Sequence, residues 1–147
     1  MAFAEATHGG VDVLVNNASG PGYHPEAPLE YWLETVQTDL LGSMCGTRHA
    51  IDYMRKRGGG AIVNIGSTSA LAHGRVYAGG SPAYDVAKSG TIRLTTMLGW
   101  LKTAENIRVN CLAPDWIATP DVKQYFDSLP LDRRGKDGIP EVLTALE

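Results

Sequence analysis

The sequence predicts an α/β protein in which an open, parallel sheet of about three strands is flanked by helices. Short apolar runs over 11–16, 61–65 and 107–112 indicate strands, and the first two are typical of parallel strands that are buried on both faces. Stretches with helical signals separate these runs, and such alternation implies right-handed crossovers between parallel strands. The chain has 147 residues, of which 44% are hydrophobic, so residues 1–147 can form one globular domain with its own core.

Proline and glycine positions justify the expected order of elements. Pro28 and Pro82 suit the first turn of a helix, and Gly58 stops the helix that precedes it. The expected elements are the tail of a helix over 1–8, a strand over 11–16, a loop over 19–24, a helix over 28–56, a strand over 61–65, a loop over 67–81, a helix from 82 to about 103, a strand over 107–112 and a short helix over 121–128.

Composition argues against several classes of protein. The net charge of −3, with basic runs only at 55–57 and 133–134, does not favour nucleic acid. No apolar run approaches the ~20 residues that span a bilayer, and no signal-peptide pattern opens the chain. We therefore expect no membrane partner and a cytoplasmic location. The four histidines are scattered without the spacing of metal ligands, so no metal site is expected.

Tyr84 and Lys88 carry the clearest chemical signal. Residues four apart lie on one face of a helix, so the phenol and the ammonium can share a site. A free phenol has a pKa near ~10, and a cation within ~4–6 Å lowers such a pKa by roughly 1–3 units. The pair could therefore pass a proton to or from an alcohol or carbonyl. Tyr77 is a weaker candidate because its i+4 residue is Ser81, which offers no cation.

Four segments in order resemble the short-chain dehydrogenase/reductase family. They are Val-Asp-Val-Leu-Val-Asn-Asn-Ala-Ser at 11–19, Ala-Ile-Val-Asn-Ile-Gly-Ser at 61–67, the Tyr-x-x-x-Lys pair at 84–88, and Arg-Val-Asn-Cys-Leu-Ala-Pro-Asp-Trp-Ile-Ala-Thr-Pro at 108–120. The resemblance implies a doubly wound, Rossmann-like sheet. It also implies hydride transfer between NAD or NADP and a secondary alcohol or ketone.

The resemblance assigns the catalytic roles to four positions. Tyr84 would be the acid/base, and Ser67 would bind the substrate oxygen, with Ser69 as a rival and Thr68 as a further alternative. Lys88 would bind the ribose hydroxyls of the cofactor and favour ionisation of Tyr84. Asp39 stands where the family usually has an asparagine, which supports a water beside the lysine mainly through its backbone carbonyl. Its charge is expected to alter the surroundings of Lys88.

The expected cofactor contacts come from the ends of all three strands. The resemblance assigns them to Asn16, Asn17, Ala18, Ile65, Tyr84, Lys88, Pro114, Ile117 and Thr119. For the two asparagines, the alternative is a purely structural role in pinning neighbouring strands. Asp115 stands where the family usually has a glycine after the proline, and a carboxylate is unfavourable near a pyrophosphate.

The glycine-rich phosphate-binding turn of the family does not occur in the sequence. Neither G-x-x-x-G-x-G nor G-x-G-x-x-G is present, and the first matched segment corresponds to the fourth strand of the family's sheet. The chain therefore resembles an incomplete Rossmann domain. Two functions remain open: an NAD(P)-dependent oxidoreductase, or a truncated, non-catalytic chain that acts through subunit association. The family resemblance implies a homodimer or homotetramer if the full domain is present.

Overall fold

The computed structural model describes residues 1–20, 22–71, 81–115, 117, 119, 120, 124 and 128. The chain falls into two units, Met1–Pro114 and Asp115–Glu147. The first unit holds the sheet and its helices, and the elements named below all belong to it. Residues 72–80 of the loop expected over 67–81, and most of the short helix expected over 121–128, lie outside the described residues.

The first unit alternates helices and strands, as the sequence predicts. Its elements, in order, are α1 (Ala2–His8), β1 (Val13–Asn16), α2 (Leu29–Val36), the π-helical η1 (Gln37–Leu41), α3 (Gly42–Arg57), β2 (Gly60–Ile65), the 3₁₀-helical η2 (Thr68–Ala70), α4 (Pro82–Met97), α5 (Leu101–Glu105) and β3 (Ile107–Leu112).

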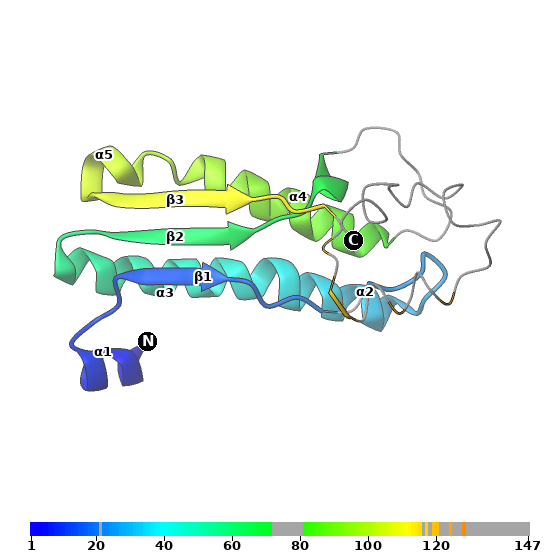
Figure 1. Ribbon diagram of the computed structural model, residues 1–147, viewed down its shortest axis with the longest axis horizontal. Helices are drawn as coiled ribbons and strands as arrows, with labels where there is room; N and C mark the ends of the chain where they lie inside the picture. The colour runs from blue at the N-terminus through cyan, green and yellow to red at the C-terminus, as the bar shows by residue number, and fades with distance from the viewer. Residues whose placement is uncertain are drawn as a thin grey trace. The chain divides into compact units, whose positions relative to one another are not determined.

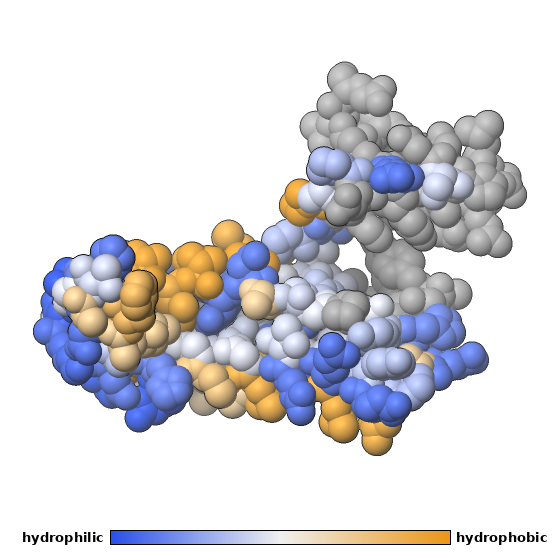
Figure 2. Space-filling view, turned by 90° about the horizontal axis from the view of Figure 1, so that it is seen from below, coloured by the Kyte–Doolittle hydropathy of each residue, from blue (hydrophilic) through white to orange (hydrophobic). Residues whose placement is uncertain are grey.

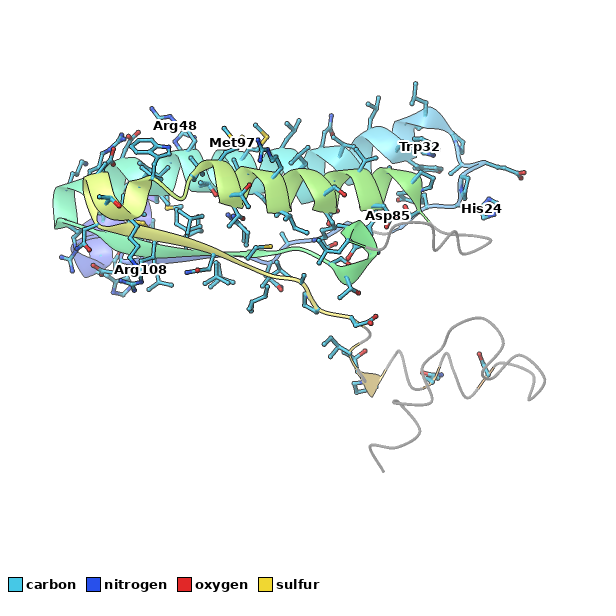
Figure 3. The ribbon with its side chains drawn as sticks, turned by 90° about the horizontal axis from the view of Figure 1, so that it is seen from above. His24, Trp32, Arg48, Asp85, Met97 and Arg108 are labelled. Atoms are coloured by element: carbon cyan, nitrogen blue, oxygen red, sulfur yellow. The ribbon has the colours of Figure 1, made fainter. Side chains whose placement is uncertain are left out.

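The three strands form one parallel sheet in the order β1-β2-β3 (Figure 1). Asn16 pairs with Asn64, and Ile65 pairs with Leu112, so all three strands end at the same edge. The long helices α3 and α4 cover one face of the sheet (Figure 3). This topology brings the residues that follow each strand to one place, which is the usual ligand-binding edge of an open α/β sheet.

The apolar core lies toward the amino ends of the strands. Its buried members are Val11, Ala50, Ile51, Met54, Ile62, Leu101 and Ile107. Gly58 ends α3 beside this core in the left-handed conformation, with a φ of 81°, which glycine adopts without strain. The prediction that Gly58 stops this helix is thus confirmed.

Two helices differ from their predicted form. The helix expected over 28–56 is continuous in sequence, but η1 widens it in the middle, and such π-helical turns often occur at functional sites. The helix expected from Pro82 to about Thr103 ends at Met97, and the separate helix α5 begins at Leu101. Leu98 leaves the helical conformation with a ψ of 4°. A turn over 98–100 thus separates the two helices.

The prediction that the first strand is buried on both faces is wrong for the structure described. Val13 and Val15 are 62% and 54% exposed, while Leu14 and Asn16 face the helices and are half-buried. Figure 2 looks from the β1 side and shows hydrophobic residues at the surface there. The alternation arises because described helices cover only one face of the sheet. Among the described residues, no helix has the length and apolar character needed to cross a bilayer.

The buried core predicts a clear contrast between two methionines. Met54 has no exposed surface, whereas Met97 is 56% exposed on α4. Met54→Ala should lower the free energy of unfolding by about 2–5 kcal/mol, because it removes buried atoms and leaves a cavity. Met97→Ala makes the same chemical change at the surface and should cost less than about 0.5 kcal/mol. Urea denaturation of both variants measures the difference, and equal losses would contradict the described core.

Candidate active site

Tyr84 and Lys88 lie in the first turns of α4, near the carboxyl ends of the strands. Pro82 begins this helix, where its missing N–H is no loss. Figure 3 shows the neighbouring Asp85 at this end of the molecule and Arg108 at the opposite end. The Lys88 ammonium nitrogen lies 5.3 Å from the centre of the Tyr84 ring. The helix thus brings the cation and the phenol together, as the four-residue spacing predicts.

The Lys88 side chain is almost completely buried, with 3% of its surface exposed. Its Nζ donates to the backbone oxygen of Ile65 at 3.0 Å and lies 3.0 Å from Oδ1 of Asp39. These two acceptors come from the end of β2 and from η1. A buried ammonium requires such partners because it has lost its hydration. The position of the charge is therefore set by the strand end and the π-helical turn together.

Ser67 lies two residues after the end of β2 and caps η2. Its Oγ accepts hydrogen bonds from the Ser69 backbone N–H at 3.2 Å and from the Ser69 hydroxyl at 2.9 Å. A hydroxyl has one hydrogen to donate, so these two bonds leave the Ser67 O–H free to donate elsewhere. Among the described residues, Ser69 thus donates its hydroxyl hydrogen to Ser67, whereas the Ser67 hydroxyl has no acceptor. The Thr68 N–H donates to the Pro114 oxygen at 3.0 Å and joins the ends of β2 and β3.

Asp39 contacts Lys88 through its carboxylate. Its backbone oxygen, the atom expected to act there by resemblance, accepts instead from the hydroxyls of Ser43 at 3.0 Å and Thr91 at 3.2 Å. The carboxylate also accepts from Ser19 Oγ at 2.5 Å and from the Gly20 N–H at 2.9 Å. The Asp39 charge thus alters the surroundings of Lys88, as expected, by forming a direct and buried ion pair with it.

A buried polar network lies under the strand ends. The Asn16 amide nitrogen donates to Asn64 Oδ1 at 2.7 Å and to Thr47 Oγ1 at 3.0 Å. Asn64, which has no exposed surface, donates in turn to Thr95 Oγ1 at 2.9 Å. Thr95 donates to the Thr91 backbone oxygen at 3.0 Å. The network links β1, β2, α3 and α4, so the Asn16 side chain has the strand-pinning contacts that were left open as the alternative role.

Gly46 allows α3 to approach the end of β1. A Cβ at this position would lie 2.6 Å from Oδ1 of Asn16, closer than real Cβ contacts come. The glycine is therefore required by close approach rather than by an unusual φ. Sequence reasoning missed Gly46, Asn64 and Thr95. The only available signal was a polar Asn64 within an otherwise apolar strand, because the partners lie 31 and 48 residues away.

Tyr23 is a second phenol near the start of α4. Its backbone N–H donates to the Ser81 hydroxyl at 3.1 Å, and its ring stacks on Tyr31 with centroids 4.6 Å apart. Partial desolvation and a 3.0 Å hydrogen bond to the Glu34 carboxylate raise the pKa of Tyr23 above its usual value. A phenol with a raised pKa is poorly suited to proton transfer near neutral pH, so Tyr23 is a weak candidate for that role.

The remaining expected site residues fall into two groups. Asn17 and Ala18 follow β1 and are exposed. Ile117 and Thr119 belong to the second unit, where the Thr119 N–H donates to the Ile117 oxygen at 2.7 Å. Asp115 begins that unit. The first unit therefore brings together Ser67, Tyr84, Lys88 and Asp39 around the carboxyl ends of β1 and β2.

The chain is an α/β protein whose Tyr–Lys pair lies near the carboxyl ends of a parallel sheet. A model of the short chain dehydrogenase family matches residues 1–129. The chain therefore belongs to the short-chain dehydrogenase/reductase family.

Individual relatives agree with this assignment. An uncharacterized oxidoreductase of Thermotoga maritima is 37% identical over 119 residues, which cover 80% of this chain and 45% of the relative. The D-beta-hydroxybutyrate dehydrogenase of Cupriavidus necator is 32% identical over 143 residues, which cover 95% of this chain and 52% of the relative. The chain thus spans about half the length of these curated relatives.

A solved structure shares the fold. The crystal structure of an acetoin dehydrogenase from Salmonella typhimurium superposes with a TM-score of 0.72 at 31% identity. The match covers 81% of this chain and 47% of that protein. The three-stranded parallel sheet with its flanking helices is thus the arrangement found in this family.

The polar network predicts that two asparagines of the sheet differ in their importance. Asn64→Leu keeps the branched shape and the number of heavy atoms but removes an acceptor from half-buried Asn16 and a donor from buried Thr95. It should lower the free energy of unfolding by about 1–3 kcal/mol. Asn110→Leu, at an exposed position of β3, is the matched control and should change it by less than about 0.5 kcal/mol. Chemical denaturation monitored by circular dichroism tests both, and an unaffected Asn64→Leu variant would count against the network.

Proposed function

We propose that this chain carries the catalytic part of a nicotinamide-dependent oxidoreductase that interconverts a secondary alcohol and a ketone. One observation carries the proposal: the buried Lys88 ammonium is fixed 5.3 Å from the Tyr84 ring at the strand ends. The pair places a phenolic proton and a fixed positive charge beside each other at the strand ends. Tyr84 would then exchange a proton with the substrate oxygen, to which the free Ser67 hydroxyl would donate a hydrogen bond.

The residues at the strand ends suit the nicotinamide riboside half of the cofactor. Lys88 gives two of its three N–H groups to Ile65 and Asp39, so one remains to donate to a ribose hydroxyl. A bound nicotinamide would supply the hydride acceptor or donor. The sequence offers no glycine-rich turn for the pyrophosphate. The groups that read the adenosine ribose are also not identified, so NAD and NADP stand as equal candidates.

The names of two relatives support the substrate class. The D-beta-hydroxybutyrate dehydrogenase is 32% identical, and a cis-4-hydroxycyclohexanecarboxylate dehydrogenase of Sinomonas cyclohexanicum is 38% identical over 140 residues. Both are named for hydroxy acids. For this chain we propose only the reaction that these names share, which is the oxidation of a carbon that bears a hydroxyl group.

The proposal predicts a specific loss on changing one hydroxyl. Tyr84→Phe should reduce turnover of secondary alcohols about 100-fold or more, because the proton donor is removed while the ring remains. Calorimetric titration of the folded protein with NAD⁺ and NADP⁺ should show saturable binding of at least one, and Tyr84→Phe should retain that binding.

Tyr53→Phe is the matched control for this experiment. Lys56 also places its ammonium over a tyrosine ring there, 4.7 Å from the Tyr53 centre, but on α3 beside the apolar core. Turnover should be unchanged in this variant. Equal activity of the Tyr84→Phe variant and the parent would refute the assignment of Tyr84, and a folded parent that binds neither cofactor would refute the proposed function.

Association of the chain with copies of itself is a second candidate function. It is favoured by large apolar side chains exposed on the helical layer, namely Leu33, Leu41, Met44, Val86 and Met97. We propose that this layer forms a homodimer or homotetramer contact. Met44→Lys should then lower the weight-average mass in sedimentation velocity, because it places a charge in the contact. A parent protein that sediments only as a monomer across a concentration series would exclude such an assembly.

A further inference from the structure

The carboxylate of Asp39 receives hydrogen bonds from two separate segments. Oδ1 lies 3.0 Å from the Lys88 ammonium and accepts from the Ser19 hydroxyl, while Oδ2 accepts from the Gly20 N–H at 2.9 Å. The Asp39 side chain has no exposed surface. A carboxylate removed from water in this way is stable only with charge-assisted partners, and here the protein supplies all of them.

These partners come from different elements beside the candidate active site. Ser19 and Gly20 follow β1, whereas Lys88 belongs to α4, and Asp39 reaches both from η1. Lys88 is held a second time by the Ile65 oxygen at the end of β2. One buried charge pair therefore ties together the segment after β1, the π-helical turn and the reactive turn of α4.

We propose that Asp39 is the positioning residue of this site, holding the Lys88 ammonium and the Ser19 hydroxyl on Oδ1 and the Gly20 N–H on Oδ2. The inference rests on the proposed function, because Lys88 and the residues just before Ser19, Asn17 and Ala18, are expected to contact the cofactor. Asp39 itself acts through Lys88 and the Gly20 backbone, and it exchanges no proton with the substrate. Its role is to fix the spacing between the two segments and to compensate the charge of Lys88.

An asparagine cannot perform this role in full. A carboxylate accepts on both oxygens, whereas an amide has one accepting oxygen and one NH₂ donor. In one orientation, the NH₂ of an Asp39→Asn variant would face the Gly20 N–H. In the other orientation, it would face the Lys88 ammonium. The substitution therefore removes either the Lys88 contact or the Gly20 contact without a change in side-chain size, whereas the Ser19 hydroxyl can bond to the amide in both orientations.

Two NMR readouts without any ligand test the proposal. The first is the hydrogen-exchange rate of the Gly20 amide, and the second is the ¹H–¹⁵N signal of the Lys88 ammonium, assigned by its loss in Lys88→Met. In Asp39→Asn, we expect Gly20 exchange to rise roughly tenfold to a hundredfold, or the Lys88 signal to shift and broaden, according to which tether is lost. A carboxylate with a merely structural role would not move the ammonium signal.

Asp85→Asn is the matched control, because it removes a carboxylate from the first turns of the same helix. It should leave both readouts unchanged. If Asp39→Asn folds and changes neither readout, the proposal is overturned. If that variant does not fold, the parent decides the matter: a Gly20 amide that exchanges as fast as in an unfolded chain overturns the proposal, and a protected one supports it.

Cofactor titration of the same proteins separates this inference from the proposed function. Altered Gly20 or Lys88 readouts in Asp39→Asn, together with no binding of NAD⁺ or NADP⁺ by the parent, would support the tether and refute the oxidoreductase. Cofactor binding by the parent, together with unchanged readouts in Asp39→Asn, would support the oxidoreductase and refute the tether.

Discussion

A lysine ammonium that has lost nearly all contact with water must find its acceptors within the protein, and much of the site follows from this requirement. Lys88 finds them at the end of β2 and on η1. The end of β2 must therefore lie beside α4, and η1 must place the Asp39 carboxylate next to the Lys88 ammonium. Because a buried charge without partners is costly, neither segment can move independently of the other.

The π-helical turn is the local irregularity that meets this requirement. Within this turn, the Asp39 backbone oxygen accepts hydrogen bonds from the hydroxyls of Ser43 and Thr91. These two side-chain hydrogen bonds satisfy the Asp39 backbone oxygen where the regular α-helical pattern is interrupted. The apolar core lies at the other end of the sheet. The packed core and the candidate site therefore occupy opposite ends of the strands.

Much of the fold could be predicted from the sequence, because local signals set it. The β-branched runs gave the three strands, and Pro82 and Gly58 marked helix boundaries by their fixed or permissive φ values. The π-helical turn and the break after Met97 were missed, since both depend on tertiary contacts rather than on residue type. The exposed face of β1 was also missed, because an apolar run does not reveal which of its faces is covered.

The candidate site divides in the same way. The helical spacing of Tyr84 and Lys88 is visible in the sequence, and so is the position of Ser67 after a strand. The contact between the Asp39 carboxylate and Lys88 is not, because it joins residues 49 positions apart. In the family, the usual asparagine acts mainly through its backbone oxygen, so the resemblance pointed to that atom of Asp39. In this chain the contact with Lys88 is made by the side-chain carboxylate.

The hydrogen bonds of Asn64 have a consequence for how the sheet avoids misfolding. Val13, Leu14 and Val15 would pair with a neighbouring strand about equally well in several alignments, because aliphatic side chains are interchangeable. Only one alignment sets Asn16 opposite Asn64, where each amide finds its partner. A slip of one residue would bury an amide without a hydrogen bond and turn aliphatic side chains to the wrong face. The two asparagines thus give the sheet its uniqueness, a property that the apolar core cannot provide alone.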